Sequence, residues 1–232
     1  SCLLLSTTAL PQENASSPLS KVRNTDVKLR YFDVEGADRL DYAVEGAMML
    51  SPKLKFRYEA RYWETDITGK DTSGMESARA KGIYFPGEGK WGNTPYRLAV
   101  GAEVKVHFDN EDKGIGQDSN TLLPFIGAAL ILRPGTTLIP LLQHELDFDG
   151  EDVNVTSFRL LALQTLPNDT WFKLDAILAV DWENDRETPS FAELQYGHQF
   201  TPTFGVYAEG MVGIGGYKPY DWGLGMGIRF VY

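Results

Sequence analysis

Apolar and polar residues alternate with a period of two along most of the chain, and helical periodicity is nearly absent. The clearest case is KLKFRYEARYW at 53–63, where Leu54, Phe56 and Tyr58 alternate with Lys55, Arg57 and further charged residues. Successive side chains of a strand point to opposite faces, so this segment predicts a strand with one apolar face and one charged face. The segments 96–108 and 171–183 repeat the pattern.

The alternation divides the chain into strands of about 10–14 residues, which exceeds the usual length in soluble proteins and suits a tilted strand that crosses a bilayer. We therefore predict twelve strands, at 25–34, 38–50, 53–65, 73–85, 95–108, 120–133, 137–148, 153–166, 170–183, 189–200, 203–214 and 221–232.

The connections between these strands fall into two classes. One class contains LSPK, LRPGT, LPNDT, FTPT and the longer FPGEGKWGNTP, all with proline. The other class is mostly longer and acidic, as in FDNEDKGIGQDSN, DFDGED and WENDRET. This asymmetry is typical of bacterial outer-membrane barrels. The predicted fold is all-β: a transmembrane antiparallel up-and-down β-barrel of about 12 strands, with short periplasmic turns and longer acidic extracellular loops.

The alternative fold is a soluble two-sheet sandwich or a lipocalin-like cup, in which the apolar face would be buried. The last strand, WGLGMGIRFVY, favours the barrel because large apolar residues from Trp222 to Tyr232 form one face and glycines line much of the other. Lipid suits such a face, and closure pairs every strand edge where no water is available. Aromatic residues near strand ends predict two interfacial girdles. We expect a bacterial outer-membrane protein with both termini in the periplasm.

Residues 1–24 carry no strand pattern, so we divide the chain into an N-terminal periplasmic segment and a barrel at 25–232. The segment is either a plug that enters the lumen or a disordered tail. A plug would use its leucines, which are Leu3, Leu4, Leu5 and Leu10. The start of the chain is similar to the end of a secretory signal, and lipidation of its single cysteine, Cys2, stays open.

With the apolar face outward, the opposite face of each strand should line the lumen. Basic residues predominate in the early strands and acidic residues in the later ones, so opposing charges could stay apart across water or interlock as ion pairs. The predicted lumen-lining residues are Lys28, Arg30, Glu45, Lys55, Arg57, Glu59, Arg61, Arg79, Lys81, Arg97, Glu103, Lys105, Glu145, Arg159, Lys173, Asp175, Asp181, Glu193, Glu209 and Arg229.

Enzyme chemistry is not indicated. Barrel hydrolases place a serine two residues after a histidine, and none of the three histidines, His107, His144 and His198, has a serine at that spacing. We predict no catalytic residue, no cofactor and no metal site. The net charge of −10 argues against nucleic acid as a partner. The expected partners are outer-membrane lipid, lipopolysaccharide and small hydrophobic solutes, and we expect a monomer.

The second half of the chain resembles the outer-membrane channel family of the meta-pathway of phenol degradation. The resemblance covers about 120–232 and rests on LIPLLQHELDF, LLALQTLPNDTWFKLDAILAVDWEN, TPSFAELQYGHQF and DWGLGMGIRFVY, including the Leu166-Pro167 turn and the Asp181-Trp182-Glu183 run. It implies a twelve-stranded channel for small hydrophobic or aromatic molecules and assigns no binding residue. Our leading hypothesis is a passive channel for such molecules; the alternatives are a narrow channel for small charged solutes and a structural or adhesive barrel.

Overall fold

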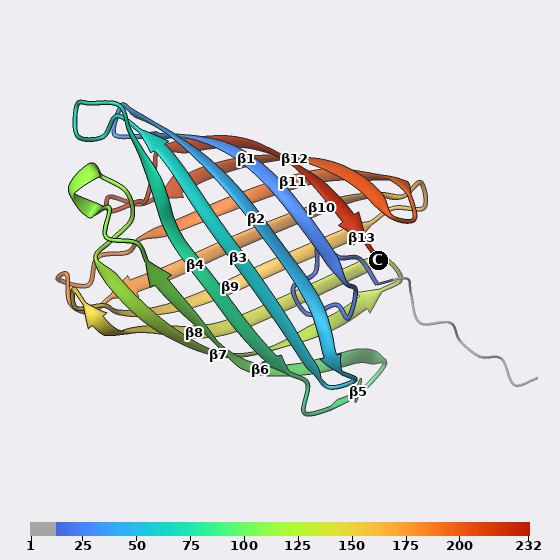
Figure 1. Ribbon diagram of the computed structural model, residues 1–232. Helices are drawn as coiled ribbons and strands as arrows, with labels where there is room; N and C mark the ends of the chain where they lie inside the picture. The colour runs from blue at the N-terminus through green and yellow to red at the C-terminus, as the bar shows by residue number, and fades with distance from the viewer. Residues whose placement is uncertain (1–12) are drawn as a thin grey trace, which may run out of the picture.

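The computed structural model describes residues 13–232, and these form a closed antiparallel barrel of twelve strands. Figure 1 shows the strands wrapped around a common axis. The strands are β1 (Asn24–Val34), β2 (Ala37–Ser51), β3 (Leu54–Thr65), β4 (Thr72–Tyr84), β6 (Thr94–His107), β7 (Ser119–Arg133), β8 (Thr136–Gly150), β9 (Asn154–Thr165), β10 (Thr170–Asp181), β11 (Ser190–Thr201), β12 (Phe204–Ile214) and β13 (Trp222–Val231), with the short β5 (Glu88–Trp91) outside the barrel.

The barrel closes through two pairings. β1 lies antiparallel to β13 along most of its length, and β4 pairs with β6, so every strand of the barrel has two neighbours. The predicted strands are confirmed, with ends that differ by two residues at most. β5 was missed because the proline- and glycine-rich segment around it carries no alternation; it pairs only with the start of β6.

The direction of the side chains agrees with the alternation. On β13, Trp222, Leu224 and Met226 are exposed on the outer surface, while Gly227 and Arg229 face inward and are buried. The outer wall is therefore apolar and the inner wall carries the charge. No helix in the part of the chain that the structure describes is long and apolar enough to cross a membrane.

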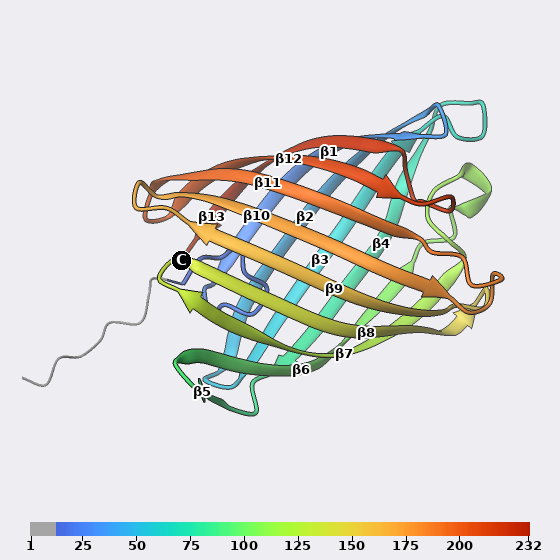
Figure 2. The same cartoon turned by 180° about the vertical axis from the view of Figure 1, so that it is seen from behind.

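The two ends of the barrel differ. At the end that holds the C-terminus and the start of β1, several strands are joined by turns of two residues, at 52–53, 134–135 and 202–203. At the other end the connections include 66–71, 108–118 and 182–189. Figures 1 and 2 show the chain terminus C and the start of β1 at the same end.

The segment 13–23 lies within the barrel at the end that holds the C-terminus, as the two opposite views show. Ser16, Ser17, Leu19 and Ser20 are buried there. The four leucines assigned to a plug lie outside the described residues, so the plug in the form predicted, which depends on them, stays a prediction.

Candidate functional site: the barrel lumen

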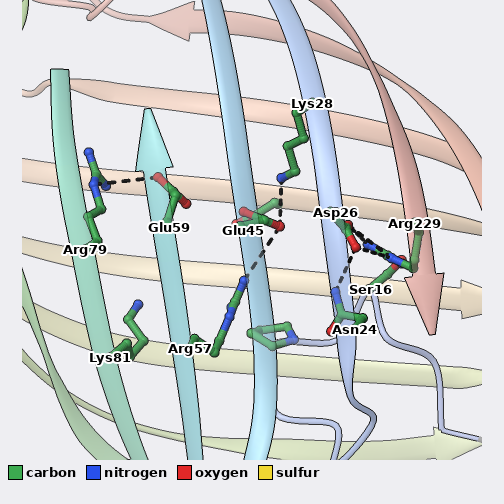
Figure 3. A network of polar contacts seen from close by, with 12 residues as sticks. Ser16, Asn24, Asp26, Lys28, Glu45, Arg57, Glu59, Arg79, Lys81 and Arg229 are labelled. Carbon is green, nitrogen blue, oxygen red and sulfur yellow. Dashed lines mark hydrogen bonds and ion pairs between the residues drawn. The ribbon is translucent and has the colours of Figure 1, made fainter. Parts of the chain in front are cut away.

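The charged side chains of the inner wall form ion pairs between neighbouring strands. Lys28 on β1 contacts Glu45 on β2 at 3.0 Å, and Lys81 on β4 contacts Glu103 on β6 at 2.7 Å. These positions are juxtaposed because adjacent strands place facing residues within reach of each other. Figure 3 shows one stretch of this network. The charges therefore interlock along the wall.

The same arrangement continues around the barrel. Arg30 reaches Glu209 at 2.9 Å, although β1 and β12 are separated by β13, whose inward glycines leave room for the contact. Of the residues predicted to line the lumen, the following take part in ion pairs with one another: Lys28, Arg30, Glu45, Arg57, Glu59, Arg61, Arg79, Lys81, Glu103, Lys105, Glu145, Arg159, Lys173, Asp175, Glu193 and Glu209.

An ion pair is buried where β1 meets β13, and only one of its two residues, Arg229, is in the predicted set of lumen residues. Arg229 on β13 donates to Asp26 on β1, with Nη2 at 2.6 Å from the carboxylate, and Tyr207 donates its hydroxyl to the same carboxylate at 3.0 Å. Ser16 also contacts Arg229. Asp26 has the same parity as Lys28 in the alternation, and that signal could have placed it in the lumen set.

In the Lys105–Glu145 pair the carboxylate is more exposed than the cation, at 28% against 11%, but three arginine pairs show the opposite order. The Arg57 side chain is 27% exposed and its partner Glu45 12%. Arg159 is 23% exposed against 5% for Asp175. Arg61 is 21% exposed against 1% for Asp41. In each of these three pairs the carboxylate lies against the wall and the guanidinium faces the open lumen. The surface that a solute would meet there is therefore cationic.

One part of the inner wall is apolar, a feature that the sequence-based set of lumen residues lacked. Nine buried residues form this cluster, which includes Leu19 of the N-terminal segment: Leu19, Ile83, Phe85, Ala99, Phe125, Ala129, Ile139, Leu141 and Leu161. On β7 and β8 apolar residues occupy both faces, so the alternation gives no contrast by which to tell the inward positions from the outward ones.

Polar groups hold the N-terminal segment beside this apolar wall. Lys55 donates to the backbone carbonyls of Pro18 and Ser20, at 3.2 and 2.6 Å. Arg97 donates to the carbonyl of Leu19 at 3.0 Å and to the carboxylate of Glu13 at 2.7 Å. The segment thus lies among side chains that the sequence assigned to the lumen.

An ion pair between Lys21 and Glu88 joins the N-terminal segment to the hairpin that β5 forms with the start of β6. Lys21 and Arg97 each approach Glu88 at 2.7 Å. The hydrogen bonds from Lys21 and from Arg97 hold the pKa of the Glu88 carboxyl below its usual value, despite the opposing effect of desolvation.

The opposite end of the lumen carries aromatic side chains. Tyr220, from the connection between β12 and β13, is buried against Phe32, with ring centroids 4.7 Å apart. The guanidinium of Arg39 lies between the rings of Phe32 and Trp63, at 4.4 and 4.3 Å from their centroids. Arg39 is buried, and stacking on aromatic faces is a favourable environment for a guanidinium.

Two features at this rim differ from the sequence-based assignment. Asp181 accepts hydrogen bonds from the backbone of Glu183 and Asn184, so its carboxylate orders the start of a loop. His107 lies 3.3 Å from Asp118 and 3.5 Å from Asp109, a grouping with metal-ligand geometry that the sequence did not suggest because the three residues lie on both sides of a loop.

Solved structures with the same fold include outer-membrane barrels of more than one activity. The NanC porin aligns over 90% of this chain and 98% of its own, with a TM-score of 0.66 and 11% identity. The COG4313 outer membrane channel from Pseudomonas putida F1 aligns over 95% and 99%, with a TM-score of 0.66 and 10% identity. The outer membrane phospholipase A from Escherichia coli aligns over 94% of each chain, with a TM-score of 0.58 and 11% identity. No protein-family model and no curated protein matches the sequence. The likeness to these structures is one of fold, and membership of the phenol-degradation family stays a prediction.

Proposed function

We propose that this protein is a passive outer-membrane channel whose lumen favours small anionic solutes. The observation that carries the proposal is the unequal exposure within the ion pairs. Arg57, Arg61 and Arg159 face the open lumen while their carboxylate partners are covered. In a narrow lumen, side-chain charges of one sign select for solutes of the other sign.

The proposal includes the location of the chain. The exposed apolar residues of the outer wall, such as Leu224 and Met226 on β13, are suited to acyl chains, and the closed sheet leaves no unpaired edge. We propose that the end with the two-residue turns at 52–53, 134–135 and 202–203, where the C-terminus and the start of β1 lie, faces the periplasm, and that membrane lipid and lipopolysaccharide contact the outer wall and rim.

Passage of small hydrophobic or aromatic molecules is the second candidate. The apolar wall around Phe125, Leu141 and Leu161 favours it, because an uncharged solute could contact this wall without displacing water from charged side chains. This wall occupies one part of the lumen only, and the exposed guanidinium groups of Arg57, Arg61 and Arg159 lie outside it. Selective passage of neutral aromatics is therefore the weaker of the two proposals.

Ion selectivity in planar bilayers tests the leading proposal. Under a salt gradient, the reversal potential of the wild-type channel should show a preference for chloride over potassium. The Arg57→Gln variant should reduce that preference. It is a clean substitution because Lys28 still pairs with Glu45. Lys53→Gln is the matched control, since Lys53 lies four residues away in an exposed turn.

A cation preference, or a reversal potential that Arg57→Gln leaves unchanged, would contradict the anionic proposal. Proteoliposome flux separates the two candidates. Faster entry of benzoate than of benzyl alcohol, measured above the rate of protein-free liposomes, favours the anionic route. The opposite order would favour the hydrophobic route.

A further inference from the structure

We propose that the N-terminal segment occupies a solute-binding site, and that this site takes a small carboxylic acid with a branched apolar body. The site consists of Lys55, Arg97 and the apolar cluster around Leu19. This inference rests on the proposed channel function and names the solute class that the site in the lumen would hold.

Lys55 is the first observation. Its side chain is 1% exposed, and within the described part of the chain its ammonium group donates only to the carbonyls of Pro18 and Ser20. Among residues 13–232 no carboxylate lies within ion-pair distance of it, whereas the other buried lysines of the lumen, Lys28, Lys105 and Lys173, each contact a glutamate. A buried ammonium is costly unless charge or hydrogen bonds compensate it. Without the segment, Lys55 would lack both acceptors and would favour an anion.

Arg97 is the second observation. Its guanidinium binds the carbonyl of Leu19 and the carboxylate of Glu13, so the segment already supplies a carboxylate to this position. The Nε of the same guanidinium donates to the carboxylate of Glu88 at 2.7 Å. Arginine binds carboxylates through parallel N–H donors, and this geometry would accept a solute carboxylate where Glu13 now lies.

The third observation is the position of the Leu19 side chain. It is 1% exposed and belongs to the apolar cluster that also contains Phe85, Phe125 and Leu141. The carbonyl of the same residue meets Arg97, and the adjacent carbonyls meet Lys55. The segment therefore places an isobutyl group and hydrogen-bond acceptor oxygens in the same site. The molecule 4-methylpentanoate keeps the leucine side chain and places a carboxylate at the position of the leucine carbonyl.

The segment and the solute would compete for one site. A tethered segment acts at a high effective concentration, so it weakens the apparent affinity for a free solute. Loosening the segment should then strengthen solute binding, since the fraction of sites that are free increases. Leu19→Ala removes the apolar anchor and leaves the carbonyl contacts of the segment in place, which makes it the appropriate variant.

The experiment is calorimetric titration of the full chain in detergent micelles with 4-methylpentanoate, and empty micelles give the baseline. Acetate and 4-methylpentanamide are the matched probes, because the first lacks the apolar body and the second lacks the charge. We expect 4-methylpentanoate to bind at least tenfold more tightly than either. Leu19→Ala should strengthen binding several-fold, Lys55→Met should abolish it, and the exposed Lys53→Met should not change it.

A second measurement reports the displacement itself. With Cys2 replaced by serine and Ser17→Cys introduced, the buried thiol should react with a maleimide several-fold faster in 4-methylpentanoate than in acetate. Equal binding of the amide and the acid, unchanged binding in Lys55→Met, or no binding even in Leu19→Ala would each overturn the proposal. If Lys55→Met does not fold, the probe comparison on the wild-type chain decides. Anion-selective conductance without this binding would refute the site and leave the channel function standing.

Discussion

The ion pair at the barrel seam allows a quantitative test of how the closed structure is stabilised. The carboxylate of Asp26 is fully buried and accepts hydrogen bonds from Arg229, Tyr207 and Asn24, at distances from 2.6 to 3.1 Å. Arg229 is 4% exposed, and its guanidinium lies over the ring of Trp171 at 5.3 Å. Asp26 and Arg229 are also register partners across the pairing of β1 with β13.

The perturbation is Asp26→Ala. It leaves the Arg229 charge buried without a partner, a change that costs about 3–5 kcal/mol in proteins. The unpaired Tyr207 hydroxyl and Asn24 amide would add to this cost, and water that enters from the lumen would relieve part of it. We therefore expect the free energy of unfolding to fall by about 3–5 kcal/mol, which is a hundredfold or larger change in the unfolding equilibrium constant.

Equilibrium unfolding in urea, in detergent micelles, is the assay, and tryptophan fluorescence can follow it because Trp171 lies beside Arg229. Asp152→Ala is the control: this residue is exposed in a loop, and the expected change is within about 0.5 kcal/mol. The double variant Asp26→Leu with Arg229→Met should recover most of the loss, since no charge stays buried. A loss below about 1 kcal/mol for Asp26→Ala, or a double variant no better than the single one, would refute the reasoning.

Three further predictions concern the wall and the segment. Leu224→Arg places a charge on the outer apolar face and should destabilise the folded barrel in lipid by about 2–4 kcal/mol, measured by the same unfolding assay in vesicles. Gly197→Ala should lower the free energy of unfolding by about 1–3 kcal/mol because its Cβ would lie 2.1 Å from the ring of Trp171. Gly210→Ala, which meets open space, should not; equal effects of the two would contradict the packing argument. The pKa of Glu88 is lowered in the folded state, so its contribution is present above its unfolded pKa of about 4.3 and is lost as pH falls through the folded value. Acidification below about pH 4 should therefore loosen the segment, seen as faster proteolysis of the N-terminus, and Glu88→Gln should remove that pH step.

The alternation was sufficient for the fold because most strands have one polar face, toward the lumen, and one apolar face. On β3, Lys55 and Arg57 point inward and Leu54 lies exposed, as the period of two requires. The same rule placed nearly all of the paired charges. It could not identify which charges pair, because Arg30 reaches Glu209 across an intervening strand, and the sequence contains no signal for the order in which the sheet closes.

The period-of-two alternation could not assign side chains to a face on strands whose two faces are both apolar. On β7 and β8 both faces are apolar, so the inward positions Phe125, Ile139 and Leu141 could not be distinguished from the outward ones. The entry of residues 13–23 into the lumen depends on carbonyl contacts to Lys55 and Arg97, and backbone acceptors are present at every residue. The sequence could therefore suggest a plug as one of two alternatives, but it could not identify the residues that the plug contacts.

The net charge of −10 is compatible with exposed cations in the lumen, because many of the acidic side chains lie in the connections between strands. Acidic side chains are concentrated in the connections: the segment 108–118 alone contains Asp109, Glu111, Asp112 and Asp118 against Lys113. At physiological ionic strength the field of exposed charges falls off over about 8 Å, so these loops repel an anion only at the rim. Arg57 and Arg159 act inside a narrow wall, where partly buried charges are screened much less. In the proposed channel, an anion that passes the rim would therefore meet an attractive field, and we expect the exposure of individual guanidinium groups to affect selectivity more than the overall charge of the chain does.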